Sequence, residues 1–265
     1  MSSTSTSSAQ LDKTAELFRA RLVTSLARAA LNPDEYLHWS SSAFSIQQAI
    51  YRIDTYYESH GSLYLPTERP MWELVESRIK GSNGSMCFSV WKSFSELRKY
   101  GHVESRIHAA DVIDQRELTH IVSLKASDVR IARALIWSYA ATPPPTVLDF
   151  WATFDECGEL IEDLDDITED GKDWNFNFWL YSYMAEGNVA KSIAGASQTL
   201  RDRLSALEGA FLRLPTGDRY RLANIVRRTL REGRRTLEQS NIVFDLISRG
   251  QVLRYGGEGL LNIGA

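Results

Sequence analysis

The chain has 265 residues, of which 43% are hydrophobic and 24% are charged, and these values are typical of a globular protein with one sizeable core. A net charge of −4 disfavours a general nucleic-acid binder, and no apolar run reaches the roughly 20 residues of a membrane-spanning helix. The two cysteines, Cys87 and Cys157, argue against a disulfide framework and offer no metal-binding Cys/His spacing. We therefore expect a cytoplasmic protein with no nucleic-acid partner and no membrane span.

Amphipathic patterns predict helices along most of the chain. In chain order they cover residues 11–31, 40–59, 67–79, 88–100, 103–120, 127–141, 155–172, 188–212 and 218–248. Strand-like alternation and internal repeats are absent from the sequence, so the predicted fold class is all-α, a single-domain helical bundle. The predicted organisation is a disordered Ser/Thr-rich tail over residues 1–10, a helical domain over 11–256 and a flexible tail over 257–265.

The most informative stretch is the acidic segment 155–172. Read as a helix at about 100° per residue, it places six carboxylates in a stripe about 100° wide and apolar side chains on the other side. The carboxylates are those of Asp155, Glu159, Glu162, Asp163, Asp166 and Asp170, and the apolar residues are Cys157, Leu160, Ile161, Leu164 and Ile167. Carboxylates at this spacing repel one another, so the stripe is either a solvated face or the wall of a cleft where cations relieve the repulsion.

A second pair of carboxylates, Asp54 and Glu58, lies one turn apart on another predicted helix. Two acidic sets on separate helices are what a Mg²⁺ cluster needs to hold a diphosphate between two walls. Positive charge gathers near the C-terminus, where ten arginines either solvate one helix face or face the acidic helix across a site. They are Arg213, Arg219, Arg221, Arg227, Arg228, Arg231, Arg234, Arg235, Arg249 and Arg254.

The acidic segment resembles the second aspartate-rich motif of the class I isoprenoid synthases, the all-helical superfamily of prenyltransferases, squalene and phytoene synthases and terpene cyclases. Its residues Glu159-x-x-Glu162-Asp163-x-x-Asp166 stand where prenyltransferases have Q-x-x-D-D-x-x-D. Laid on the cyclase motif N-D-x-x-S-x-x-x-E, the same segment has Glu162, Asp166 and Asp170 at the metal-binding positions. The resemblance covers roughly residues 40–256 and implies the helical bundle of that superfamily.

Other positions resemble the superfamily's first motif and its diphosphate-binding residues. Asp54-x-x-x-Glu58 is similar to the D-x-x-x-D motif of squalene synthase relatives, and Gly171-Lys172 follows the acidic segment as in prenyltransferases. By the same resemblance, Arg116, Lys125, Lys172 and Arg254 bind the substrate diphosphate. Arg254-Tyr255 is similar to the catalytic C-terminal Arg-Tyr pair of cyclases, on a segment that closes over the site.

The resemblance implies an enzyme that binds three Mg²⁺ ions through Asp54, Glu58, Glu162, Asp163, Asp166 and Asp170. It ionises a linear prenyl diphosphate of the C10–C20 class to an allylic carbocation inside a pocket lined by aromatic side chains. Arg254-Tyr255 favours a terpene synthase, which is a carbon–oxygen lyase of isoprenoid biosynthesis. The alternatives are head-to-head prenyl transfer, as in squalene and phytoene synthases, and a non-catalytic relic of the fold. A homodimer is left open.

Overall fold

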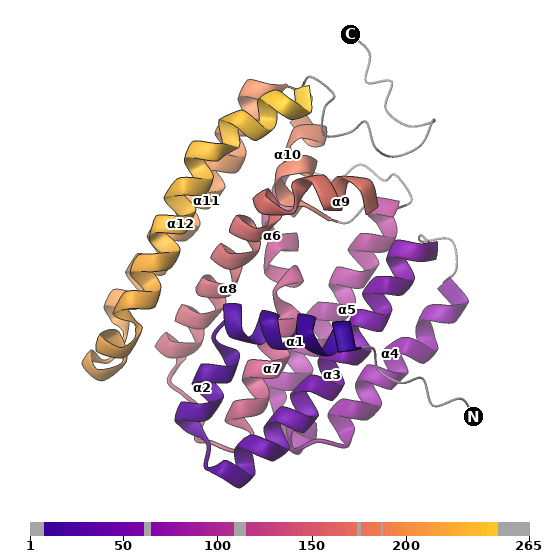
Figure 1. Ribbon diagram of the computed structural model, residues 1–265, viewed down its shortest axis with the longest axis vertical. Coiled ribbons are helices and arrows are strands. Elements are labelled where there is room, and N and C mark those ends of the chain that lie inside the picture. Colours follow the sequence, from indigo (N-terminus) through magenta and orange to yellow (C-terminus); the bar gives the residue numbers. More distant parts are fainter. Residues whose placement is uncertain (1–7, 61–64, 109–114, 174–175, 187, 249–265) are drawn as a thin grey trace. The chain divides into compact units, whose positions relative to one another are not determined.

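The computed structural model describes residues 8–60, 65–108, 115–173, 176–186 and 188–248 (Figure 1). Every regular element within these ranges is a helix, which confirms the prediction of an all-α protein. None of the helices in the described ranges combines the length and apolarity needed to cross a bilayer. The first helix begins at Ser8, within the tail predicted over residues 1–10, and the predicted tail over residues 257–265 lies outside the described ranges.

The chain divides into two compact units. Unit 1 comprises Met1–Asp111 and Ile121–Glu156, and unit 2 comprises Val112–His120 and Cys157–Ala265. The domain predicted over residues 11–256 therefore spans both units. Two helices contribute to each of them: α6 (Gln115–Lys125) begins in unit 2 and ends in unit 1, and α8 (Pro145–Asp165) begins in unit 1 and ends in unit 2.

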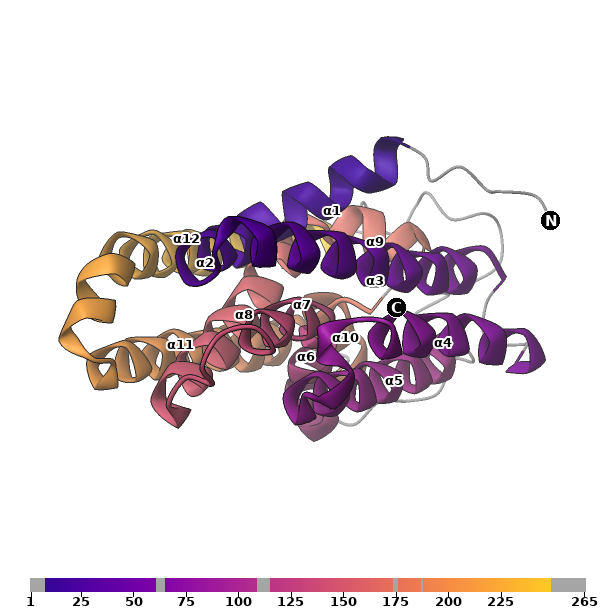
Figure 2. The ribbon, with the colours of Figure 1, turned by 90° about the horizontal axis from the view of Figure 1, so that it is seen from below.

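Unit 1 is built mainly from the N-terminal helices, and α7 lies against several of them (Figure 2). The elements besides α6 and α8 are α1 (Ser8–Ala20), α2 (Val23–Ala30), α3 (Pro33–His60), α4 (Leu65–Lys80), the 3₁₀ turn η1 (Asn83–Met86), α5 (Phe88–His108) and α7 (Ser127–Trp137). The α7 sequence is mostly apolar, and its described side chains are nearly all buried. The indole of Trp39 on α3, fully buried, donates a hydrogen bond to the carbonyl oxygen of Ala132 on α7 at 3.0 Å.

The helix predicted over residues 11–31 is wrong as a single helix, because the chain breaks after Ala20. Leu22 adopts a left-handed backbone conformation with φ of 60°, which is uncommon for a residue other than glycine. The guanidinium of Arg21 is buried at this turn and donates a hydrogen bond to the carbonyl oxygen of Asp155 at 2.7 Å. A tertiary contact of the preceding residue thus accompanies the turn that separates α1 from α2.

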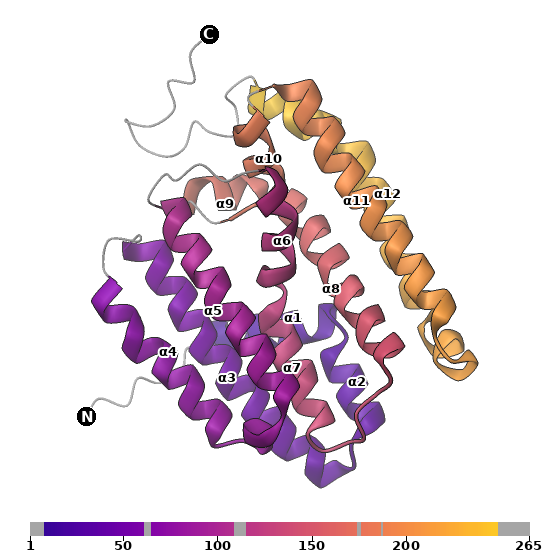
Figure 3. The ribbon, with the colours of Figure 1, turned by 180° about the vertical axis from the view of Figure 1, so that it is seen from behind.

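Unit 2 contains a long helical hairpin. The elements of unit 2 besides α6 and α8 are α9 (Ile167–Asp173), α10 (Phe178–Glu186), α11 (Val189–Arg213) and α12 (Thr216–Ser248). The hairpin consists of α11 and α12, which run side by side along their lengths (Figures 1 and 3). A Cβ atom at Gly233 of α12 would stand 2.7 Å from both methyl carbons of Leu204 on α11, so glycine permits the close approach of the two helices. Ser197 and Ser240 also share a hydrogen bond across the pair.

Further helix predictions differ from the structure: the helix predicted over residues 40–59 begins at Pro33, and the one predicted over 127–141 ends at Trp137. A break was expected between residues 100 and 103, yet α5 runs through Gly101 to His108, and the next helix starts at Gln115. The segment Phe178–Glu186 was not predicted as a helix, although it forms α10. Its first residues, Phe178 to Leu180, are all buried and therefore show no amphipathic period.

Candidate functional site

The acidic segment forms the end of α8, a bend at Asp166 and the short helix α9. Helical hydrogen bonds continue through the bend: the N–H of Asp166 donates to the carbonyl of Glu162, and the N–H of Asp170 donates to the carbonyl of Asp166, both at 2.9 Å. Three of the predicted metal ligands, Glu162, Asp166 and Asp170, consequently follow one another at intervals of one turn. Such a row carries three negative charges along one line of the segment.

Burial divides the predicted acidic stripe into two sets. Asp155, Glu159 and Asp163 are buried, although they share the stripe with the other three carboxylates. Asp166 is exposed, and Glu162 and Asp170 are half-buried. The interpretation of the whole stripe as a solvated face is therefore wrong for the buried set. The apolar side of the segment is buried as expected. Its fully buried residues are Cys157, Leu160, Leu164 and Ile167, and Ile161 is half-buried.

Asp155, which is completely buried, belongs to a charge network inside unit 1. Its Oδ2 accepts a hydrogen bond from Nη1 of Arg133, whose side chain is 4% exposed. The other terminal nitrogen of Arg133 donates to the carbonyl of Arg21 at 2.9 Å, and the guanidinium lies 4.4 Å from the ring centroid of Trp151. The carboxylate of Asp155 thus compensates a buried arginine, which is a structural role.

The neighbouring Glu156 is held in a similar way. Arg130 on α7 donates to Oε1 of Glu156 at 3.2 Å and lies 3.6 Å from Oε2 of Glu96 on α5. Arg130 is largely shielded from water, with its side chain 15% exposed, so these ion pairs are screened less than surface pairs. Two arginines of one helix therefore bind the first carboxylates of the acidic segment.

Asp163 and Asn177 fix the start of α10. Oδ2 of Asp163, which is 1% exposed, accepts a hydrogen bond from the N–H of Phe178 at 2.8 Å. Asn177 caps the helix, because its Oδ1 accepts from the N–H groups of Trp179 and Leu180. The amide nitrogen of Asn177 donates to the carbonyl of Asp163 and to Oδ2 of Asp170 at 2.8 Å.

The buried amide of Asn177 therefore lies between a predicted metal ligand, Asp170, and the backbone of the segment. Sequence reasoning missed this residue. The signal that could have found it was an asparagine directly before the apolar run Phe178-Trp179-Leu180, which is the pattern of a helix N-cap. It also missed Arg133, for which the sequence offers no signal, because an arginine in the middle of a buried helix is not expected.

The remaining predicted residues lie on several helices. Asp54 is half-buried on α3 in unit 1, and Lys125 is half-buried at the end of α6. Glu58, Arg116 and Lys172 belong to α3, α6 and α9, respectively, but their side chains lie outside the described part of the structure. Arg254 and Tyr255 lie outside the described residues altogether.

The carboxylates of the segment offer oxygen ligands, which is the chemistry that Mg²⁺ prefers. Within the described residues, however, no three His, Cys, Asp or Glu side chains form a group that could hold a metal ion. Glu162, Asp166 and Asp170 each already interact with another group of the protein. The donor chemistry fits Mg²⁺, but the described arrangement is not a preformed metal site.

Aromatic side chains, which the resemblance expects to line a substrate pocket, differ widely in their exposure. Trp39 and Trp179 are fully buried, and Trp179 donates a hydrogen bond to the carbonyl of Leu160 at 2.8 Å, so both serve as core residues. Phe88 is 81% exposed at the start of α5, which does not suit a residue that lines a dry pocket.

No family model, curated protein or solved structure matches this chain.

Proposed function

We propose that this protein is a Mg²⁺-dependent class I terpene synthase that ionises a linear prenyl diphosphate of the C10–C20 class and releases diphosphate. The observation that carries the proposal is the row of Glu162, Asp166 and Asp170, one turn apart and partly or fully exposed, in contrast to the buried carboxylates of the same segment. Buried carboxylates paired with arginine are structural, whereas a row of accessible carboxylates is suited to bind a cation.

In this proposal the three carboxylates would hold the cation and thereby the diphosphate end of the substrate. Bound Mg²⁺ would stabilise the negative charge that builds on the leaving diphosphate as the allylic C–O bond breaks. The hydrogen bond from the side-chain amide of Asn177 to Oδ2 of Asp170 helps to orient that carboxylate. By resemblance, Arg116, Lys125, Lys172 and Arg254 donate hydrogen bonds to the diphosphate, and Tyr255 accompanies Arg254.

The test is the release of inorganic diphosphate from geranyl, farnesyl and geranylgeranyl diphosphate, with and without Mg²⁺. Asp166→Asn should lower turnover by orders of magnitude, because it removes the middle charge of the row. The matched control is Asp165→Asn. Asp165 is exposed like Asp166 and precedes it in the chain, but it lies about 100° round the helix and therefore outside the row. Equal activity of the two variants would contradict the assignment of the row as cation ligands.

The mass of the product separates the two enzymatic alternatives. A hydrocarbon or alcohol with the carbon number of its substrate indicates a terpene synthase. A product with twice that carbon number indicates head-to-head condensation, the alternative that the pair Asp54 and Glu58 favours by its resemblance to squalene synthase relatives.

One structural observation favours a second candidate, a non-catalytic helical protein. Within the described residues no group of three metal-binding side chains comes together, and Asp163 and Asp170 both take part in the hydrogen bonds around Asn177. A protein of this kind would release no diphosphate from any of the three substrates at any Mg²⁺ concentration, while its circular dichroism would show a folded helical chain.

A further inference from the structure

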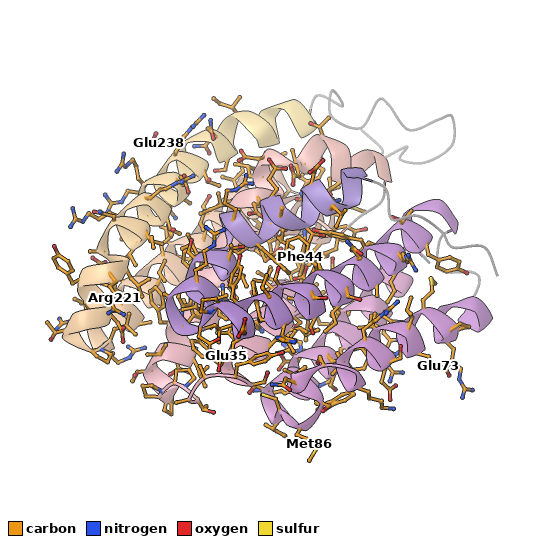
Figure 4. The ribbon with its side chains drawn as sticks, turned by 60° about the horizontal axis from the view of Figure 1, so that its bottom comes forward. Glu35, Phe44, Glu73, Met86, Arg221 and Glu238 are labelled. Carbon is orange, nitrogen blue, oxygen red and sulfur yellow. The ribbon has the colours of Figure 1, made fainter. Side chains whose placement is uncertain are left out.

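The arginine-rich face of α12 is a feature that the proposed function does not use. Six arginines of this helix are exposed: Arg221, Arg227, Arg228, Arg231, Arg234 and Arg235. At about 100° per residue they occupy a sector about 140° wide. The buried residues of α12 lie on the opposite side, towards α11: Val226, Thr229, Gly233, Thr236 and Ser240. We refer to the sector of the six arginines as the basic face; Figure 4 labels two of its residues, Arg221 and Glu238.

Little negative charge on this face offsets the arginines. Arg228 pairs with Glu232 at 2.7 Å at the edge of the sector, and among the side chains that the structure describes on α12, Glu238 is the one carboxylate within the sector itself. The whole chain carries a net charge of −4, so the basic face opposes the charge of the rest of the protein. A concentrated positive surface on an acidic protein directs an anionic partner to one place.

The basic face also carries apolar side chains at its two ends. Tyr220 is 89% exposed and Ile242 is 63% exposed, and both fall within the same sector as the arginines. Along a helix the two residues are separated by about 33 Å, and the arginines from 221 to 235 fill about 21 Å of that interval. Leu212, at the end of α11, adds a third exposed apolar side chain, 62% exposed, next to the hairpin turn.

From this arrangement we infer that α12 docks on the surface of an anionic lipid bilayer. Guanidinium groups bind phosphate oxygens through paired hydrogen bonds, and several of them on one face of a long helix match a plane of lipid headgroups. Tyrosine and aliphatic side chains at the ends of the row would enter the headgroup region, where such side chains anchor peripheral proteins. A nucleic acid would satisfy the arginines as well, but it offers no apolar environment for Ile242. The inference does not rest on the proposed function.

The test uses the full chain and co-sedimentation with phosphatidylcholine vesicles, with or without phosphatidylserine in equal amount. Binding should require phosphatidylserine and weaken as salt rises, since exposed charges are screened. The triple variant Arg227→Gln, Arg231→Gln, Arg234→Gln should bind the vesicles about a hundredfold more weakly, because each arginine near an anionic surface raises the affinity about fivefold. The three corresponding lysine substitutions should retain most of the binding.

A matched control removes the same charge from unit 1. Arg78, Lys92 and Arg98 are exposed, and their triple replacement by glutamine should leave vesicle binding within about twofold of the wild type. An equal loss in both triple variants would attribute binding to net charge and overturn the assignment of the basic face. Melting temperatures close to that of the wild type establish that each variant is folded.

Two further measurements separate a bilayer from other anions. Tyr220→Ser with Ile242→Ser should weaken vesicle binding without changing its salt dependence, because these side chains contribute apolar contact only. Unchanged binding in this double variant would overturn the role of the apolar ends. Binding to duplex DNA or RNA more tightly than to phosphatidylserine vesicles at the same salt concentration, through the same three arginines, would overturn the bilayer assignment and identify a nucleic-acid surface.

Discussion

Replacing Asp155 by asparagine removes the carboxylate that compensates Arg133, while the size of the side chain stays nearly constant. Both partners are buried, and the guanidinium keeps only its bond to the carbonyl of Arg21 and its contact with Trp151. Breaking a buried ion pair by removing one partner costs about 3–5 kcal/mol. The asparagine oxygen can still accept one hydrogen bond, worth about 1 kcal/mol, so we expect a loss of about 3 kcal/mol in the free energy of unfolding.

Urea denaturation followed by far-ultraviolet circular dichroism and by tryptophan fluorescence measures this loss. The matched control is Asp149→Asn, an exposed aspartate on the same helix, which should change stability by less than about 0.5 kcal/mol. Replacing both partners with apolar residues, Arg133→Met with Asp155→Leu, should cost less than Asp155→Asn alone, because no buried charge is left uncompensated. A stability of Asp155→Asn within 0.5 kcal/mol of the wild type, roughly the scatter of surface substitutions, would refute the assigned role of the pair.

The same denaturation measurement checks two other variants. Asn177→Ala removes the cap of α10 and leaves the buried carbonyl of Asp163 without its side-chain donor, so it should cost about 2–4 kcal/mol. The cap variant Asn188→Ala, at the exposed start of α11, should cost only about 1 kcal/mol, and equal losses would contradict the buried role of Asn177. Gly233→Ala gains about 1 kcal/mol of helix propensity but overpacks against Leu204 at a cost of about 1–3 kcal/mol. We expect a net loss for this variant, and a gain of the full 1 kcal/mol would show that the two helices do not need the glycine.

Helices whose sequence carries an amphipathic period could be predicted, because one face of each meets water. The prediction for residues 188–212 and 218–248 agrees with α11 and α12 to within two residues at each end. The break at Leu22 could not be found in this way, since it accompanies a contact between Arg21 and the distant Asp155. The helix α10 escaped detection because burial of all its first residues leaves no period to read.

For the candidate site, the sequence indicated that the acidic segment is unusual, but it did not indicate which of its carboxylates are buried and which are exposed. Six carboxylates at helical spacing look alike in a sequence, whereas in the structure Asp155 faces Arg133 and Asp163 faces the N–H of Phe178. Those partners lie on other helices or beyond a bend of the chain, so no local pattern identifies them. The exposed member Asp166 could be singled out only through the resemblance to a known motif.

The most direct test of the proposed function is the melting temperature of the protein with Mg²⁺ and inorganic diphosphate, each alone and together. A ligand at a hundredfold excess over its dissociation constant stabilises the folded state by about 2.7 kcal/mol, which for a chain of this size raises the melting temperature by about 5–10 °C. We predict such a rise with the pair, much less with either component alone, and its loss in Asp166→Asn but not in Asp165→Asn. An unchanged melting temperature with the pair, or the same rise in both variants, would contradict a cation and diphosphate site at the acidic segment.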